Sequence, residues 1–394
     1  PYDAEYDSEA SESEDLIQDP PKLRKPTDNA FKQQRLRAYN PVFTAKTVIP
    51  LLVVIAIVFA PLGAAMWYAS HVVQDITIDY SQCEKLALRD YYSAIPNEYL
   101  DFRLKNFNNK DAVATWKLET DETQQFDDER NVCLIRFEVP HELKGPIYFF
   151  YRLKNFYQNH RRYAKSFSED QIQGMKALIS DIKDTIGQNC EPVLTDAAGK
   201  IIYPCGLILN SLFNDTYSET LTGVNGTSKD YVMTEKGIAW SSNSDRYQKT
   251  KYSYKDIVPP PNWYKKFPNG YNETNVPDIL TWSQFHNWMF TAGLPTFNKL
   301  ALRNDKEALP KGTYEITIGL HFPVLPYKGQ KFVYILQRLA IGGKNPFLGI
   351  AWMVGGGICM LLALVLLTVN LVRPRKTGDV NLLSWNKEQF KQDS

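Results

Sequence analysis

The sequence lacks the short motifs by which common enzyme classes are recognised. It contains no GxxxxGK[ST] phosphate-binding loop, no HExxH zinc motif and no GxSxG nucleophile elbow. Its five histidines, His71, His141, His160, His286 and His321, are scattered along the chain and do not form a pair with metal-ligand spacing. The sequence therefore predicts no catalytic residue, no metal site and no cofactor in this chain, and it does not indicate nucleic-acid binding.

Charged residues are absent from two long stretches. The 24 residues from Thr47 to Ser70 contain no Asp, Glu, Lys or Arg, and neither does the stretch from Asn345 to Val372. At 1.5 Å per residue, each is long enough to cross about 30 Å of hydrocarbon. A buried core helix and a secretory signal are the alternatives, but a signal would be shorter and closer to the start. We expect transmembrane helices at 47–70 and 345–372.

Cations lie unequally on the two sides of the first stretch. No Lys or Arg follows it until Lys85. Because cations beside a membrane helix stay cytoplasmic, both termini are expected in the cytoplasm, as tails 1–46 and 373–394, with a lumenal or extracellular ectodomain at 71–344 between them. Residues 1–21 carry eight acidic side chains and no basic one, which predicts disorder. The cations before the first stretch include Lys22, Arg24, Lys25, Lys32, Arg35, Arg37 and Lys46.

Cysteine is scarce, but its placement tests this topology. Four of the five cysteines, Cys83, Cys133, Cys190 and Cys205, lie between the two charge-free stretches, and Cys359 lies inside the second. Disulfides persist outside the cytosol, so the placement agrees with a lumenal or extracellular domain. Three pairings of the four are open from the sequence. A zinc site is the rival interpretation, which the absence of a CxxC motif disfavours.

All three acceptor triplets for N-linked glycosylation fall in the same region. They begin at Asn214, Asn225 and Asn272. One such triplet arises easily by chance, but the position of all three between the predicted membrane helices gives them weight. We expect N-linked glycans on a disulfide-bonded ectodomain.

Alternating apolar residues predict that the ectodomain is mainly β. The pattern is clear at 314–322, 133–139 and 76–80, each read as a half-buried strand, and the aromatic stretch 147–153 is typical of a central strand. The expected fold class is a membrane protein with two transmembrane α-helices and a large, mainly antiparallel, sandwich-like ectodomain with short helical insertions.

Two capping boxes predict where helical insertions begin. Ser168 with Gln171 precedes Ile172, Met175 and Ile179, and Thr281 with Gln284 precedes a second apolar group. That second group is Phe285, Trp288 and Met289.

Three further features allow two interpretations each. Small residues in the second membrane stretch, with Ala351 and Gly355 four apart, are either a helix-packing site or ordinary membrane composition. The cluster from Asn159 to Tyr163 either binds an anionic headgroup or has a structural role, and the structural role is favoured. The run Pro259–Trp263 is a rigid turn with a tryptophan, read as architecture or an interface.

Five longer motifs carry a resemblance to a known family. The chain resembles the fungal accessory β-subunits, or ligand-effect modulators, of type IV P-type ATPase lipid flippases, over about residues 27–372. The motifs are Phe31-Lys-Gln-Gln-Arg-Leu36, Asn155-Phe-Tyr-Gln-Asn-His-Arg-Arg-Tyr163, Tyr203-Pro-Cys-Gly206, Asn210-Ser-Leu-Phe-Asn-Asp-Thr216 and Pro259-Pro-Pro-Asn-Trp263.

The resemblance implies a noncatalytic subunit and chaperone of a phospholipid flippase. A type IV P-type ATPase would be its partner, membrane phospholipids would be the substrate of that partner, and the complex would leave the endoplasmic reticulum for the Golgi or endosomes, with the plasma membrane as an alternative. The resemblance also favours the sequential disulfides, Cys83 with Cys133 and Cys190 with Cys205. It marks seven residues as partner contacts, namely Phe31, Gln34, Arg35 and Arg37 on the cytoplasmic side and Gly355, Gly356 and Gly357 in the second membrane helix.

One departure from the family and two rival functions complete the expectations. Many relatives have arginine at the position of Phe290, so a charge contact there is in doubt and the choice of ATPase can differ. A self-sufficient lectin or receptor would bind a ligand through its isolated ectodomain. An enzyme acting on lipid headgroups would turn over substrate without any ATPase.

Overall fold

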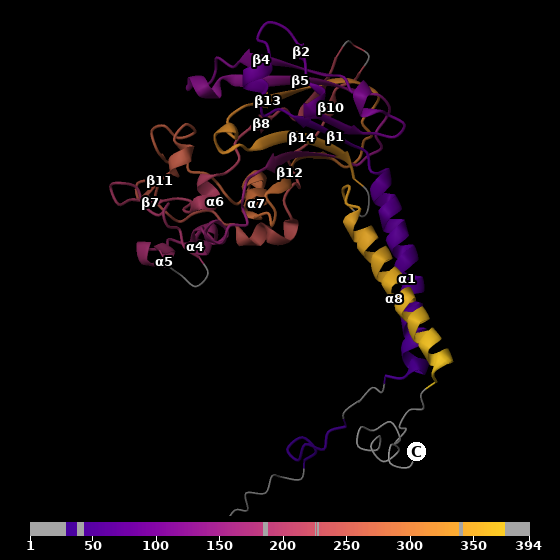
Figure 1. The fold of residues 1–394 in the computed structure, drawn as a ribbon. Helices are drawn as coiled ribbons and strands as arrows, with labels where there is room; N and C mark the ends of the chain where they lie inside the picture. The colour runs from indigo at the N-terminus through magenta and orange to yellow at the C-terminus, as the bar shows by residue number, and fades with distance from the viewer. Residues whose placement is uncertain are drawn as a thin grey trace, which may run out of the picture. The chain divides into compact units, whose positions relative to one another are not determined.

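The computed structural model describes residues 29–37, 43–183, 188–224, 226, 228–338 and 342–374. The chain forms two compact units, one of residues 1–55 and 359–394 and the other of residues 56–358, and each is described by itself. The division falls inside the two long helices, α1 (Ala45–Val72) and α8 (Phe347–Val372). All other helices and strands of the described residues belong to the second unit (Figure 1).

The two predicted membrane helices are confirmed as the long apolar helices of the described chain. Their most apolar stretches have mean hydropathies of 2.7 and 2.5, and only 11% of each is buried. A core helix of a soluble protein would be covered on most sides, whereas these helices expose nearly all of their apolar surface. Such a surface is stable in lipid, so the chain is an integral membrane protein.

The ectodomain is built on two antiparallel sheets. The first has the order β12-β6-β14-β1-β3, and β6 pairs with strands on both of its sides, so its predicted central position is confirmed. In that order the bounds are Thr296–Asn304, Ile147–Lys154, Gln330–Gln337, Asp75–Asp79 and Leu100–Arg103.

The second sheet has the order β10-β9-β13-β5-β4-β2, and β8 also pairs with β13. In that order, with β8 last, the bounds are Tyr231–Val232, Thr220–Gly223, Gly312–Gly319, Asn131–Val139, Ala114–Thr120, Ser93–Ala94 and Thr216–Tyr217. A small parallel pair is formed by β11 (Ile257–Val258) and β7 (Ile201–Ile202).

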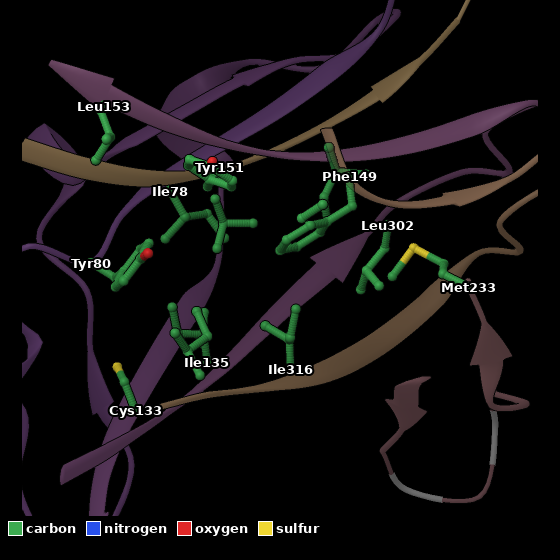
Figure 2. Close-up of a cluster of buried hydrophobic side chains, with 14 of the residues drawn as sticks. Ile78, Tyr80, Cys133, Ile135, Phe149, Tyr151, Leu153, Met233, Leu302 and Ile316 are labelled. Atoms are coloured by element: carbon green, nitrogen blue, oxygen red, sulfur yellow. The ribbon is translucent and has the colours of Figure 1, made fainter. Parts of the chain in front are cut away.

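The main core lies between the two sheets. Figure 2 shows Ile78 and Phe149 of the first sheet pointing toward Ile135 and Ile316 of the second, and all four are fully buried. Because alternate residues of a strand point to opposite faces, the period-two pattern of β5 and β13 places one apolar set between the sheets. The predicted sandwich is therefore confirmed.

Strand β1 differs from its prediction as a half-buried strand. All five of its residues are buried, including Asp75, Thr77 and Asp79 on the face away from the main core. The Asp75 carboxylate accepts a 2.6 Å bond from Arg103 Nη2, and Asp79 accepts bonds from Ser81 and Gln330. Burial raises the pKa of both carboxyls. Asp75 and Asp79 are thus covered and hydrogen-bonded, whereas Thr77 Oγ1 is buried without a hydrogen bond among the described residues.

Only the serine half of the first predicted capping box is present, because the Gln171 side chain bonds Ile202 O and Cys205 N instead of Ser168 N, and the helix is shorter than expected. Ser168 Oγ accepts a bond from Gln171 N at 3.3 Å at the start of α4 (Glu169–Ile172). Gly174 then adopts a φ of 74°, a conformation that ends helices, and Met175 N donates to Asp170 O. Met175 therefore lies outside the helix and is exposed, and Ile179 begins a separate helix, α5 (Ile179–Lys183).

The prediction of the second capping box is wrong, because the N-cap lies one residue later than expected. Helix α7 (Ser283–Met289) has Trp282 as its N-cap, because the first bond of the helix runs from His286 N to Trp282 O. Thr281 therefore caps nothing. The predicted apolar face of this helix is confirmed, since Phe285, Trp288 and Met289 are buried. The remaining short α-helices of the described residues are α2 (Cys83–Leu86), α3 (Arg161–Ala164) and α6 (Leu207–Asn210).

Candidate interaction surfaces

The ectodomain motifs that carry the family resemblance meet around helix α6. Trp263 Nε1 donates to Leu209 O at 2.9 Å, and Asn262 N donates to Asn210 Oδ1 at 2.9 Å. The Tyr163 hydroxyl lies 2.9 Å from Ser211 Oγ. Three motifs that lie far apart in the sequence are thus joined by hydrogen bonds at one short helix, so much of their sequence serves the architecture.

Gly206 shows why the motif Tyr203–Gly206 ends in glycine. It precedes α6 with a φ of 105°, which side chains disfavour, and a Cβ there would lie 2.1 Å from Ser166 O. The same motif places Cys205 for its bond to Cys190, and Cys83 is bonded to Cys133. This is the sequential pairing, and sulfurs bonded to each other are not available as zinc ligands.

A buried ion pair anchors the motif Asn210–Thr216. Lys331 Nζ lies 2.7 Å from Asp215 Oδ2, and both side chains are almost fully buried. The Tyr80 hydroxyl donates to the same oxygen at 2.9 Å, while the backbone N–H groups of His321 and Phe322 donate to Oδ1 at 2.7 Å. Burial, followed by the charge of Asp215, raises the pKa of Tyr80 and keeps it a donor. The buried charges are therefore fully satisfied.

The cluster from Asn159 to Tyr163 divides into two parts. Asn159 Nδ2 donates to Gly293 O at 3.0 Å, and Tyr163 packs inward, so these two have the structural role. Arg161 and Arg162 are exposed at the start of α3 and form no ion pair with the described residues. The structural interpretation therefore does not extend to the two arginines.

The segment that carries these arginines, and a loop hydrogen-bonded to it, also expose apolar side chains. Tyr157 and Leu294 are 57% and 69% exposed. Their chain segments are held together because Phe156 N donates to Pro295 O at 3.1 Å and Ala292 N donates to Gln158 Oε1 at 2.8 Å. We call Tyr157, Arg161, Arg162 and Leu294 the cationic patch. Phe290, the position that departs from the family pattern, is also exposed.

Small residues at intervals of seven line the contact between the two long helices. Gly63 of α1 meets Gly349 and Met353 of α8, and a Cβ added at Gly349 would lie 2.6 Å from Trp67 N. The buried positions are Ala56, Gly63 and Ser70 in α1 and Gly349, Gly356 and Ala363 in α8. The sequence analysis used the four-residue spacing of Ala351 and Gly355 and missed the seven-residue spacing. The signal that could have revealed it is one small residue at every seventh position of both helices.

The three predicted glycine contacts have different surroundings in this helix pair. A Cβ at Gly356 would lie 3.0 Å from Ala60 N, so this glycine already packs against the chain's own α1. A Cβ at Gly355 would reach only the edge of the Phe59 ring at 3.9 Å, and one at Gly357 has no described atom within 4 Å. Gly357 is therefore the most open of the three to another helix.

The predicted cytoplasmic contacts form a short exposed segment. Phe31 is 71% exposed, Gln34, Arg35 and Arg37 are also exposed, and Gln34 has a φ of 55°. A turn is closed by a 2.7 Å bond from Arg35 N to Ala30 O. Their role as partner contacts stays a prediction, and the predicted disorder of 1–21 lies outside the described residues.

Two of the predicted glycosylation acceptors are exposed. Asn214 and Asn272 lie at the surface, and Asn225 is outside the described residues. The Asn272 Oδ1 atom accepts bonds from Thr274 N and Thr274 Oγ1, each 2.9 Å long. The Asn272 Nδ2 atom forms no hydrogen bond with the described residues. Glycan attachment at these sites stays a prediction.

Comparison with known proteins adds an independent result. Residues 66–376 match the model of the LEM3 (ligand-effect modulator 3) family / CDC50 family. The chain is 45% identical to a phospholipid-transporting ATPase accessory subunit, LEM3, of Saccharomyces cerevisiae, over 97% of this chain and 92% of the relative. It is 41% identical to the accessory subunit CDC50 of Chaetomium thermophilum, over 94% and 93%. It is 33% identical to cell cycle control protein 50A of Mus musculus, over 89% and 90%.

Proposed function

The chain belongs to the LEM3/CDC50 family, and we propose on that premise that it is the noncatalytic β-subunit of a type IV P-type ATPase that transports phospholipids. The ATPase hydrolyses ATP and moves the lipid. This chain forms a heterodimer with it, stabilises it for exit from the endoplasmic reticulum and supports its transport cycle.

The observation that carries the proposal is the cationic patch. Two exposed arginines that form no ion pair with the described residues, on a segment that also exposes Tyr157 and is hydrogen-bonded to the loop of Leu294, have the composition of a protein-binding surface, where Arg and Tyr are enriched. Anionic lipids are concentrated in the cytoplasmic leaflet, so on the opposite side of the membrane they offer these cations little. An acidic surface on the non-cytoplasmic loops of the ATPase is the better complement.

The helix pair supports the same conclusion. Neither charge-free stretch contains an ionisable carboxylate or cation that could line a transport path, so the pair does not move a polar lipid headgroup by itself. Its small residues are mostly used between its own helices, and Gly355 and Gly357 remain for the approach of a third helix. We place the contact with the membrane helices of the ATPase there.

The topology and location are part of the proposal. Both termini lie in the cytoplasm, as the cations before α1 favour, and the disulfide-bonded ectodomain carries its N-glycans in the lumen. Phe31, Gln34, Arg35 and Arg37 then contact the cytoplasmic side of the partner. The complex works in the Golgi or endosomes after passing through the endoplasmic reticulum.

The first test is recovery of the partner. The full-length tagged chain is purified in mild detergent, its partners are identified by mass spectrometry, and ATP hydrolysis is measured in the eluate. We expect a P-type ATPase in near-equal amount, with lipid-stimulated hydrolysis that is lost when the phosphorylated aspartate of that ATPase is replaced. Recovery of this chain alone, folded and monomeric, would contradict the proposal.

A second test addresses the cationic patch. The double variant Arg161→Glu/Arg162→Glu reverses two charges at the proposed interface, and we expect ATPase recovery to fall about tenfold, equivalent to about 1.4 kcal/mol. The matched control is Lys306→Glu/Lys311→Glu, which reverses two exposed charges in the β12–β13 connection. Equal losses in the two variants would show that net charge matters and that the patch does not.

A further inference from the structure

One cavity of the ectodomain has a predicted glycosylation acceptor in its wall. Its volume is about 950 Å³, and its lining includes residues 210–217, 262–266 and 321–323. Cavities of about 300–1,000 Å³ are the usual size of ligand sites. Asn214 is one of the lining residues, so a group attached to its Nδ2 atom begins at the cavity wall.

The chain on both sides of Asn214 is held in place. The Phe213 ring stacks on Tyr151 with their centroids 4.0 Å apart, and Asp215 is fixed by the buried pair with Lys331. Thr216 continues into β8, where it pairs with Gly319 of β13. The Asn214 side chain is exposed and forms no hydrogen bond with the described residues. Its position is therefore set by its neighbours, and its amide remains free for attachment.

The cavity wall has the chemistry that binds carbohydrate. Trp282 and the half-exposed Tyr264 supply aromatic faces, and the amide of Asn262 supplies donors and an acceptor for hydroxyl groups. Gln284 Oε1 accepts a 3.0 Å bond from Trp282 Nε1 and orients that ring. Lys266 Nζ lies 4.4 Å from the centroid of the Trp282 ring and adds a donor. Sugar rings combine apolar C–H faces with hydroxyl edges, so a wall that mixes aromatic rings with amides suits them.

We propose that the N-linked glycan on Asn214 lies in this cavity, with its first sugars against the wall formed by Tyr264 and Trp282. In the attachment, Asn214 Nδ2 forms a bond to the anomeric carbon of a lipid diphosphate-linked oligosaccharide. The bond from that carbon to the diphosphate breaks, the lipid diphosphate leaves, and Nδ2 loses one proton. Tethering then gives the sugars a high effective concentration at the wall without strong binding of free sugar.

Asn272 provides the contrast within the same chain. It is exposed in a turn and does not line this cavity, so a glycan there extends into solvent. The inference rests on the lumenal ectodomain of the proposed function, because only that side of the membrane carries the glycosylation machinery. The test of the Asn214 glycan is separate from the test of partner recovery, because protection of each glycan is measured whether or not an ATPase is present.

The test is the rate at which peptide N-glycosidase releases each glycan. The full-length chain is treated in mild detergent, with and without its co-purified ATPase, and occupancy at Asn214 and Asn272 is followed by mass spectrometry of peptides. We expect release from Asn214 to be at least about tenfold slower than from Asn272 in the native protein. After denaturation and reduction, the two rates should become equal.

A cavity variant separates protection by the wall from protection by a partner. Tyr264→Ser removes a half-exposed ring, and we expect it to speed release from Asn214 several-fold without changing Asn272; Gln284→Ala is the second variant, should the first not fold. An unoccupied Asn214, equal native rates at the two sites, or protection that requires the ATPase and ignores both variants would each overturn the inference.

Discussion

Two groups of cations in the same ectodomain are treated in opposite ways. Lys331 is buried, and every oxygen of its partner Asp215 is hydrogen-bonded. Arg161 and Arg162 are exposed, and they form no ion pair with the described residues. A buried charge that the fold pairs and hydrogen-bonds holds the fold together, whereas exposed charges with no ion pair among the described residues are available to a partner. Stability and partner binding should therefore be separable by mutation.

The largest effect is expected from Lys331→Met, which leaves Asp215 charged and buried. Breaking one side of a buried pair costs about 3–5 kcal/mol, so the thermal midpoint of the full-length chain should fall steeply. The control is Lys117→Met, which breaks the exposed pair with Glu119 and should cost less than about 1 kcal/mol.

The double variant Asp215→Asn/Lys331→Met sharpens this prediction. Asparagine keeps an acceptor for the backbone N–H groups of His321 and Phe322, and it removes the unpaired charge. The double variant should therefore be more stable than Lys331→Met alone. If breaking the Lys331–Asp215 pair and breaking the Lys117–Glu119 pair cost the same free energy of unfolding, the distinction between buried and exposed cations would not hold.

The helix pair offers the same comparison with uncharged residues. Gly349→Leu forces a side chain against the Trp67 backbone, so we expect about 1–3 kcal/mol of destabilisation and a lower yield of folded protein. Gly357→Leu adds the same side chain where no described atom lies within 4 Å, so the folded yield should be unchanged while ATPase recovery falls. Gel filtration and partner quantification of both variants measure the two quantities. A Gly357 variant with the low folded yield of the Gly349 variant would contradict the assignment.

Several features of the fold were predictable because they depend on local patterns. The charge-free stretches specify α1 and α8 by length, and the alternation in β5 and β13 specifies which residues face the core. The covered face of β1 was not predictable, because Asp75 and Asp79 look solvent-facing until Arg103, Ser81 and Gln330 close over them. Long-range partners of buried polar residues leave no periodic signal in the sequence.

The candidate partner-binding surface was likewise predictable from the sequence only in part. The resemblance pointed to the stretch Asn155–Tyr163, but only the fold separates the inward Asn159 and Tyr163 from the outward arginines. Leu294 could not be assigned to that surface from the sequence, since it is 132 residues beyond Arg162 and the two segments are joined by a bond from Phe156 N to Pro295 O. The seven-residue spacing in α1 and α8 was readable in principle, because both sets of small residues are regular.

Lys299 is an intermediate case, and it carries the smallest predicted effect. Its side chain is buried without a carboxylate partner among the described residues, and its Nζ atom donates to Asn287 O at 2.7 Å and to Phe290 O at the end of α7. Burial lowers the pKa of Lys299 to about 8, whereas in the unfolded chain it keeps its usual value of 10.5. Between these values the unfolded state binds more protons, so the contribution of Lys299 to the free energy of unfolding increases with pH.

The expected gain is about 1 kcal/mol between about pH 8 and 9, within the limit of about 1.4 kcal/mol per pH unit for one group. Thermal midpoints of the full-length chain across this range should therefore rise relative to those of Lys299→Met, which has no proton to release there. Parallel pH profiles would mean that the two carbonyl oxygens stabilise the ammonium as fully as Asp215 stabilises Lys331. In that case carbonyl oxygens stabilise a buried cation in this fold as well as a carboxylate does. The absence of a carboxylate partner among the described residues would then not mark Arg161 and Arg162 as partner contacts, and only their exposure would.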